Sequence, residues 1–361
     1  MSWELVHILS NAHLQDRDVV ENDYLAIVPL TDRRLAEIFK ARPIAKTVLS
    51  TFTEQFGAPI HPAVLLRNTT APQTIDAQAI IAFRNTWAMC SIIYGWSHQI
   101  LRQNVFNPLW SDFFDIYPVV VGREHLMIRS PAIQNLDEPS LFRGQTSPLV
   151  GNPNSLQFRN DSSLLKLILR AWDRRFVRGQ TGWKTSVLFR SLAVAFQACR
   201  APFDNTGIIY DIGTSLALWV SAFEVLTHPS GSKASLETVV NLLELSQWNY
   251  RRLRNKRYAI WIRNKSRRCS LISRLYYELY EARNDFLHGN KVTTKRLFPF
   301  KDQLQPQILQ LAPLIYRVAL KVYCQQFADN RRIRDDSNHE YFFFHGIEKS
   351  LLKVITKPAS K

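Results

Sequence analysis

The sequence predicts a mainly α-helical protein, with a helical bundle in its C-terminal part and a smaller mixed α/β domain in its N-terminal part. Three observations lead to this fold class. Only 12 of the 361 residues are glycine, which argues against a turn-rich β architecture. Hydrophobic residues make up 46% of the chain and aromatic residues 12%, enough for a packed core. Long stretches also carry apolar residues at helical spacing.

The N-terminal part combines short strands with helices. Apolar runs predict strands at Tyr24–Leu30 and Tyr117–Val121, and His125–Arg129 is expected to pair with the second as a hairpin. Helical spacing predicts three helices, at Asp32–Ala41, Ile44–Phe56 and Ile75–Arg102. Asp32 and Asp76 are candidate helix caps. No catalytic arrangement is apparent, so residues 1–150 are expected to act as a sensor or to bind a partner protein or ligand.

The segment Ser130–Asn160 is rich in proline and polar residues, which is typical of a loop or linker. It separates the N-terminal domain (1–150) from a bundle (155–330), which is followed by a polar, basic tail (331–361). The predicted bundle helices are Ser162–Arg178, Lys184–Arg200, Ile212–Thr227, Ser235–Ser246, Cys269–His288 and Pro306–Phe327. Short connections between such helices favour an all-α bundle.

The chain is strongly basic, with a formal net charge of +16. Such an excess favours a polyanionic partner, although a solvated basic surface that aids solubility is the alternative. The four cysteines are far apart in the sequence, with no CxxC pair and no zinc spacing, so we expect buried thiols in a reducing compartment and neither metal nor cofactor.

Neither a signal peptide nor a membrane span is expected. The first residues lack a basic segment followed by an apolar one. The apolar runs Ala79–Trp96 and Leu311–Cys324 are interrupted by Arg84 and Arg317, which favours core helices. The sequence therefore predicts a cytoplasmic protein.

The most informative residue is Arg283, in the predicted helix Cys269–His288. At about 100° per residue, Ile272, Tyr276, Leu279 and Leu287 all fall within about 40° of Arg283. The guanidinium is thus expected in the middle of the apolar stripe. Because it stays charged, it requires a carboxylate, a phosphate or a hydrated cleft.

His288 follows five residues later, just before Gly289, at the expected helix end. Histidine transfers protons near neutral pH, and arginine binds phosphate and stabilises developing charge. RNA supplies its own nucleophile, the 2′-OH, so this pair suffices for transesterification without metal. We expect His288 to move the proton, Arg283 to bind the scissile phosphate and Asn284 to orient either group.

The spacing alone is a weak signal. Arginine near a helix end followed by His-Gly is also ordinary capping chemistry. The same Arg-x4-His spacing recurs at Arg334 and His339, in a polar stretch without an apolar stripe, where it indicates a solvated tail. The surrounding residues therefore select Arg283 and His288.

Glu224 lies in a predicted helix that is apolar nearly all round, so it is expected to be buried. A buried glutamate needs a cationic partner or becomes protonated. Arg283 is one candidate partner, in which case Glu224 positions the guanidinium; capping or pairing elsewhere is the alternative.

The segment Tyr280–Gly289 resembles the signature helix end of HEPN domains, particularly the ApeA-like branch: Arg, a polar residue, then His four to six positions after the Arg, commonly followed by Gly. Leu216–Leu226 resembles the earlier apolar helix of the family, with its embedded acid. The resemblance covers about residues 160–330. It implies a helical bundle, a homodimer that brings two Arg/His pairs together, and metal-independent RNA cleavage, in many members for bacterial defence or as a toxin. Some relatives are inactive scaffolds.

A basic segment, Arg251–Arg268, runs directly into this helix. It holds nine Lys or Arg residues and no acid. Basic groups neutralise phosphates, and aromatic faces stack on unpaired bases. The alternative is an exposed basic loop with Tyr258, Ile260 and Trp261 packed inward. The candidate RNA-binding residues are Arg251, Arg252, Arg254, Lys256, Arg257, Tyr258, Trp261, Arg263, Lys265, Arg267 and Arg268.

Together these features predict a metal-independent endoribonuclease that acts as a homodimer. The alternative is a catalytically inactive HEPN-type module that binds nucleic acid or protein. Peripheral membrane binding is disfavoured, because Arg254, Arg257 and Arg268 leave no clean apolar face opposite the charge.

Overall fold

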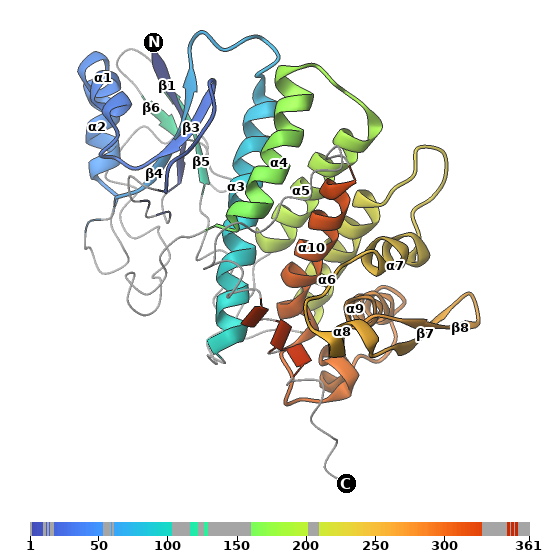
Figure 1. The fold of residues 1–361 in the computed structure, drawn as a ribbon. Coiled ribbons are helices and arrows are strands. Elements are labelled where there is room, and N and C mark those ends of the chain that lie inside the picture. The colour runs from blue at the N-terminus through green and yellow to red at the C-terminus, as the bar shows by residue number, and fades with distance from the viewer. Residues whose placement is uncertain are drawn as a thin grey trace. The chain divides into compact units, whose positions relative to one another are not determined.

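The computed structural model divides the chain into two compact units (Figure 1). Unit 1 comprises Met1–Trp87 and Asn107–Arg159, and unit 2 comprises Ala88–Phe106 and Asn160–Lys361. The structure describes residues 2–9, 12, 14, 18–52, 59, 61–102, 116–121, 126–128, 160–200, 209–326, 345–346, 348–349 and 351–352. The predicted linker and most of the predicted tail, including Arg334 and His339, lie outside these residues.

Unit 1 contains an antiparallel sheet of six strands in the order β2-β3-β4-β1-β5-β6. The strands are β1 (Trp3–Leu9), β2 (Val20–Glu21), β3 (Leu25–Val28), β4 (Ala63–Asn68), β5 (Ile116–Val121) and β6 (Leu126–Ile128). The predicted strands at β3 and β5 are confirmed, as is the β5–β6 hairpin. Strands β1, β2 and β4 were not predicted.

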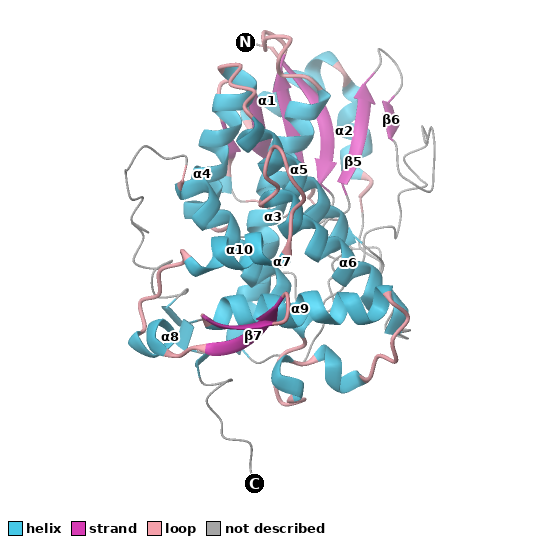
Figure 2. Ribbon diagram, turned by 90° about the vertical axis from the view of Figure 1, so that its right-hand side faces the viewer, coloured by secondary structure: helices cyan, strands magenta, loops and turns pink. Residues whose placement is uncertain are grey.

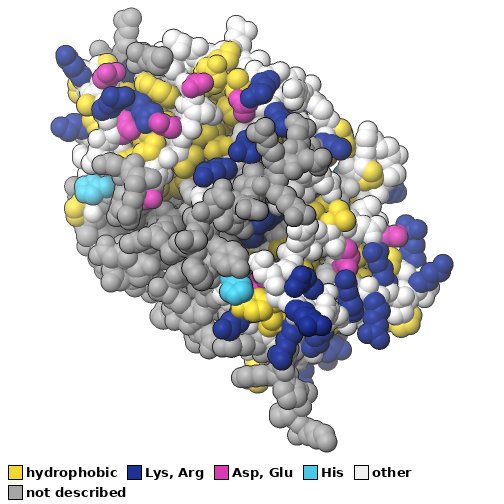
Figure 3. Space-filling model, viewed as in Figure 1, with side chains coloured by type: hydrophobic (Ala, Val, Ile, Leu, Met, Phe, Trp, Pro, Cys, Tyr) yellow, Lys and Arg dark blue, Asp and Glu magenta, His cyan; other side chains and the backbone are white. Residues whose placement is uncertain are grey.

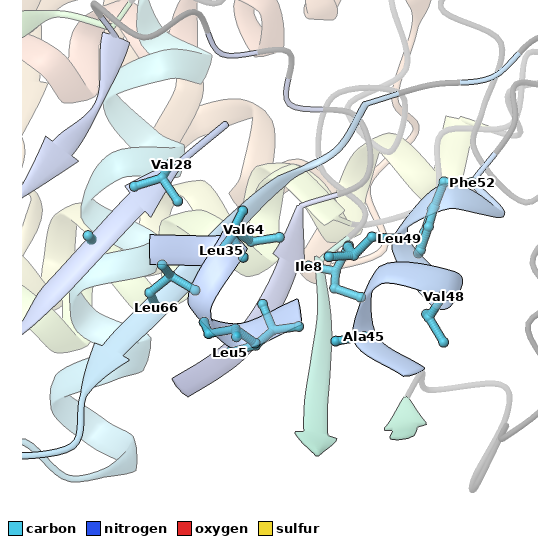
Figure 4. Close-up of a cluster of buried hydrophobic side chains, with 12 residues drawn as sticks. Leu5, Ile8, Val28, Leu35, Ala45, Val48, Leu49, Phe52, Val64 and Leu66 are labelled. Carbon is cyan, nitrogen blue, oxygen red and sulfur yellow. The ribbon is translucent and has the colours of Figure 1, made fainter. Parts of the chain in front are cut away.

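Two helices pack on one face of this sheet: α1 (Arg33–Ala41) and α2 (Pro43–Ser50). Figure 4 shows the cluster of buried side chains between these helices and the sheet. The strands contribute alternate residues to it, such as Val64 and Leu66 of β4. The Asp32 side chain caps α1 by accepting a hydrogen bond from the Arg34 amide, as predicted. Helix α2 ends at Ser50, before the predicted Phe56, which lies outside the described residues.

Helix α3 (Ala77–Arg102) begins as predicted, with the Asp76 side chain accepting a hydrogen bond from the Ala79 amide. The boundary between the two units falls within this helix, between Trp87 and Ala88. The structural boundary is therefore more complex than the predicted division at about residue 150, because the second half of α3 belongs to the helical unit.

The described part of unit 2 is mainly helical and includes a β-hairpin (Figure 2). Its longer helices are α4 (Ser162–Trp172), α5 (Trp183–Arg200), α6 (Ile209–Leu226), α7 (Leu236–Glu244), α9 (Leu271–Leu287) and α10 (Ile308–Gln325). All six were predicted with bounds within three residues, except that α4 passes at Asp173 into a π-helical turn, η4 (Asp173–Val177). The shorter elements are α8 (Arg251–Asn255), β7 (Tyr258–Ile262), β8 (Lys265–Cys269), η5 (Thr294–Leu297) and η6 (Pro299–Lys301).

Helix α6 lies in the core of unit 2, where it packs against α5, α9 and α10. Its apolar residues explain this position, since Trp219 and Phe223 are fully buried. The Phe223 ring lies 4.8 Å from the ring of Tyr276 in α9 and 5.3 Å from that of Tyr316 in α10, measured between centroids. Aromatic packing thus fixes α9 against the bundle core.

A buried ion pair ties the start of α4 to α10. Asp161 is fully buried and caps α4 by accepting a hydrogen bond from the Leu164 amide. The Arg317 guanidinium donates to the other oxygen of the same carboxylate. Arg317, which interrupts a predicted core helix, therefore lies in the core because Asp161 neutralises it.

The four cysteines, Cys90, Cys199, Cys269 and Cys324, are free and buried, as predicted. Among the described residues, no helix has the length and apolar character that a membrane span requires.

Candidate functional site

Helix α9, which carries the candidate site, begins at a well-anchored end. The Ser270 side chain caps it by accepting a hydrogen bond from the Ser273 amide. Glu244, at the end of α7, accepts hydrogen bonds from the Ser270 amide at 2.7 Å and the Ser273 hydroxyl at 2.6 Å. Burial of Glu244 opposes ionisation, but these hydrogen bonds and the Arg257 guanidinium hold its pKa below the ordinary value. The start of α9 is therefore fixed to α7.

One face of α9 lies against α6. Ile272, Tyr276 and Leu279 are fully buried, which confirms the predicted apolar stripe for these three of its four residues. Near the other end of the contact, a Cβ atom added to Gly213 of α6 would lie 2.7 Å from Cδ1 and 3.3 Å from Cβ of Phe286. The two helices approach this closely because residue 213 has no side chain.

The opposite face of α9 carries acids that bind arginines. Arg296, from the turn η5, contacts Asp285 at 2.7 Å, Glu281 at 3.6 Å and Glu278 at 3.9 Å. Glu278 also pairs with Arg274, one turn earlier on the same helix. These ion pairs hold the last turns of α9 from the side away from α6.

Arg283 lies on the α6 side, and its side chain is 17% exposed. Nη2 donates to both carboxylate oxygens of Glu224, at 3.2 and 3.3 Å, and Nη1 donates to Oδ1 of Asn284 at 2.9 Å. The guanidinium also lies over the Tyr280 ring, 5.2 Å from its centroid. Nε of Arg283 is buried and has no hydrogen-bond partner. The expected contact with Glu224 is therefore present, and one donor remains unused.

Glu224 is only partly buried, with 24% of its side chain exposed, whereas the sequence predicts a buried residue. Burial raises the pKa of its carboxyl group, and the charge of Arg283 only partly opposes this effect. Glu224 thus binds a proton more readily than an ordinary glutamate, and protonation would weaken its hold on Arg283.

His288 occupies the C-cap position of α9, and its side chain is exposed. Its amide donates to the Asn284 carbonyl at 2.9 Å. Gly289 follows with φ of +68°, and the Asn290 amide donates to the Asp285 carbonyl at 3.0 Å. This is the helix stop that the sequence predicted, because glycine adopts a positive φ without strain. The imidazole is consequently open to solvent.

Within one chain, Arg283 and His288 do not meet. Five residues of α-helix separate them by about 7.5 Å along the axis and about 140° around it. The Arg283 side chain also reaches towards Tyr280, which is away from His288. Asn284 connects them, since its side chain contacts Arg283 and its carbonyl contacts the His288 amide. Leu287 is 59% exposed, so its predicted place on the buried apolar stripe is wrong.

The basic segment forms a short helix and a hairpin rather than a loop. Helix α8 is followed by β7 and β8, which pair through a two-residue turn at Arg263 and Asn264, with φ of 48° and 63°. These values match a type I′ turn, the two-residue hairpin turn in which both central residues have positive φ. Ile260 is fully buried, as the inward-packed alternative expected, but Trp261 is 60% exposed. That alternative is therefore wrong for Trp261.

Three of the nine cations form an ion pair or hydrogen bond with another side chain: Arg257 with Glu244, Arg263 with Glu237 and Arg267 with Asn241. The other six are exposed and have no carboxylate partner among the described residues: Arg251, Arg252, Arg254, Lys256, Lys265 and Arg268. Figure 3 shows Lys and Arg side chains gathered over the region that Figure 1 labels α8, β7 and β8. We call these six residues the basic patch.

Several residues of this site were not anticipated. The contacts of Glu244 and Gly213 join elements far apart in the sequence, and Arg296 lies on a separate turn after α9, so no helical pattern indicates them. The hairpin did have a signal in the sequence, because the run Tyr258–Ile262, rich in aromatic and β-branched residues, stands directly before the Arg-Asn turn. Within the described ranges, no group of three or more His, Cys, Asp or Glu side chains is placed to hold a metal ion.

Comparison of the chain with family models, curated proteins and solved structures yields no match. The resemblance to HEPN domains therefore depends on the residues of the two helices themselves, Leu216–Leu226 and Tyr280–Gly289.

Proposed function

We propose that this protein is a metal-independent endoribonuclease whose reacting groups are His288 and Arg283. The observation that carries the proposal is the exposed imidazole of His288 at the end of α9, the helix that holds a half-buried, incompletely bonded guanidinium. The basic patch precedes α9 in the chain and supplies an RNA-binding surface.

The reaction needs only groups of the protein and the RNA. A His288 imidazole removes the proton from a ribose 2′-OH, and the 2′-oxygen attacks the adjacent phosphorus. The bond from phosphorus to the 5′-oxygen breaks, and an imidazolium returns a proton to that oxygen. Arg283 binds the phosphate oxygens as charge develops on them. The products are a 2′,3′-cyclic phosphate and a 5′-hydroxyl.

The separation of Arg283 and His288 within one chain leads us to propose a homodimer. Across a two-fold axis, the Arg283 of each chain would face the His288 of the other, which gives two equivalent sites with one imidazole each; that imidazole is the base and, once protonated, the acid. Leu287, an exposed leucine beside His288, is suited to such a contact. This arrangement uses the same surface on both chains.

The chemistry is tested by incubating the purified chain with RNA in the presence of a chelator. We expect cleavage by the wild type, loss of cleavage in His288→Ala, and retention in His61→Ala, which removes a different exposed histidine. Equal rates for the wild type and His288→Ala would refute the proposal.

The two-chain site is tested by mixing Arg283→Ala with His288→Ala, each inactive alone. If Arg283 and His288 come from different chains, half of the mixed dimers are heterodimers with one intact site, which restores about a quarter of wild-type activity. A mixture as inactive as its components would show that each site lies within one chain.

A second candidate function is a catalytically inactive module that binds RNA or a partner protein. The Glu224–Arg283 ion pair favours it, because a guanidinium neutralised inside the protein is less available to phosphate. RNA binding without cleavage by the wild type would select this function. A cytoplasmic location, a sensor role for residues 1–150 and a role in bacterial defence or as a toxin remain parts of the proposal.

A further inference from the structure

The β7–β8 hairpin presents an aromatic side chain that has no partner in the described chain. Trp261 is 60% exposed, and no ring, hydrogen-bond or ion contact engages its indole. Trp183, the other exposed tryptophan of the described residues, differs: it donates a hydrogen bond to the His228 carbonyl and packs against the His228 ring. Exposing the larger part of an indole to water forfeits stabilisation, so Trp261 is suited to contact with something outside the chain.

The register of the hairpin places charge beside this indole. Trp261 pairs with Ser266, and the next pair on the same face is Ala259 with Arg268. Arg268 is therefore a diagonal neighbour of Trp261, close enough for both side chains to contact one ligand. Ile260, on the other face, is fully buried, which fixes Trp261 and Arg268 on the outer side.

Tyr258, by contrast, faces the protein. Its ring is half-buried, lies 5.6 Å from the Phe300 ring and is covered by the Lys256 ammonium at 5.4 Å. Of the two aromatic residues assigned to RNA binding from the sequence, only Trp261 thus offers an open ring face.

We infer that the outer face of the hairpin binds unpaired RNA. One base stacks on Trp261, and the flanking phosphates contact Arg268 and the other residues of the basic patch. The inference rests on the proposed function in taking RNA as the partner, and it deepens that proposal by naming single-stranded RNA as the substrate class. Every base has a π-face that an indole accepts, but in a duplex those faces are already stacked on neighbouring bases. A-form RNA also has a major groove too narrow for a side chain to enter.

The test uses the full chain carrying His288→Ala, so that no RNA is cut during the measurement. Binding is measured by fluorescence anisotropy with an unstructured RNA strand, alone and annealed to its complement. We expect Trp261→Ala to weaken binding of the single strand by about tenfold, the loss of one stacked base, and to leave duplex binding unchanged. Trp261→Phe should recover most of the loss, because a phenyl ring also stacks.

Two controls separate stacking from charge and from a general apolar effect. Leu304→Ala removes another exposed apolar side chain and should change nothing. The slope of log K against log salt concentration measures how many phosphates the protein contacts. Arg268→Gln should reduce the magnitude of this slope by about 1, the loss of one phosphate contact, whereas Trp261→Ala should leave it unchanged. Unaltered single-strand binding by Trp261→Ala, or an equal loss with duplex, would overturn the inference.

The outcomes also distinguish this inference from the nuclease proposal. If the wild type cleaves RNA but Trp261→Ala does not weaken binding, the nuclease proposal stands and the stacking inference is wrong. If binding depends on Trp261 but the wild type does not cleave RNA, the stacking inference stands and the nuclease proposal is wrong.

Discussion

Replacing Gly213 with alanine tests whether the contact between α6 and α9 sets the position of the candidate site. The added Cβ would lie 2.7 Å from Cδ1, 2.9 Å from Cγ and 3.3 Å from Cβ of Phe286. Rotation of the ring moves Cδ1 but leaves Cγ and Cβ in place, so the backbone of one helix must shift. Phe286 lies two residues before His288, so the shift would also displace the imidazole.

The expected change in stability follows from two opposing effects. Overpacking a helix contact costs roughly 1–3 kcal/mol, and the short distances place this contact in the upper part of that range. Replacing glycine by alanine inside a helix returns about 1 kcal/mol. We therefore expect Gly213→Ala to lower the free energy of unfolding by about 1–2 kcal/mol.

The measurement is urea unfolding of the wild type, Gly213→Ala, Phe286→Ala and the double variant. In the double variant the ring is absent, so Gly213→Ala should become stabilising by about 1 kcal/mol, the helix-propensity term alone. Gly231→Ala, at a turn glycine where an added Cβ meets nothing within 4 Å, controls for the loss of a glycine without a new contact or a change in helix propensity. If Gly213→Ala stabilises the protein even with Phe286 present, the inferred close approach is wrong.

Two further substitutions test the anchors of the bundle. Asp161→Asn breaks the buried ion pair with Arg317 and should cost roughly 3–5 kcal/mol in thermal or urea unfolding, because the buried guanidinium loses the charge of this carboxylate; a loss below about 1 kcal/mol would show that the pair is not needed. Glu244→Gln should be less stable than the wild type at neutral pH. Because the folded protein lowers the pKa of Glu244, its contribution is present above the ordinary value of 4.5 and is lost as the pH falls through the lowered pKa. The difference between wild type and Glu244→Gln should thus shrink in acid, while Glu237→Gln, at a more exposed glutamate, should show little difference at any pH.

The sequence predicted the helices of unit 2 well because each has a long apolar period and a local stop or cap. Asp32 and Asp76 were correctly identified as caps for the same reason, since a cap and its helix are adjacent in the chain. Strands β1 and β4 were missed because each pairs with residues about sixty positions away, so no local pattern indicates the pairing. Their stability comes from the sheet rather than from their own residues.

The candidate site was only partly predictable. Glu224 was linked to Arg283 across 59 positions because each is a charge in an apolar helix, and two such charges need one another. The structure adds contacts between elements that the pattern of one helix does not indicate. Glu244 fixes the start of α9, the missing side chain at Gly213 leaves space for Phe286, and Arg296 binds the acids on the opposite face of α9. The exposure of Trp261 follows from the register of the β7–β8 hairpin. This hairpin was not predicted from the sequence, because the segment was considered only as a run of basic residues.

The most direct test of the proposed mechanism is the chemistry of the cut ends. The wild-type chain is incubated in chelator with an RNA strand and, separately, with the same sequence in which every ribose carries a 2′-O-methyl group, and the products are analysed by mass spectrometry. We predict fragments ending in a 2′,3′-cyclic phosphate and a 5′-hydroxyl from the RNA, and no cleavage of the methylated strand. Fragments with a 3′-hydroxyl and a 5′-phosphate, or cleavage of both strands, would contradict the role assigned to the 2′-OH and to His288.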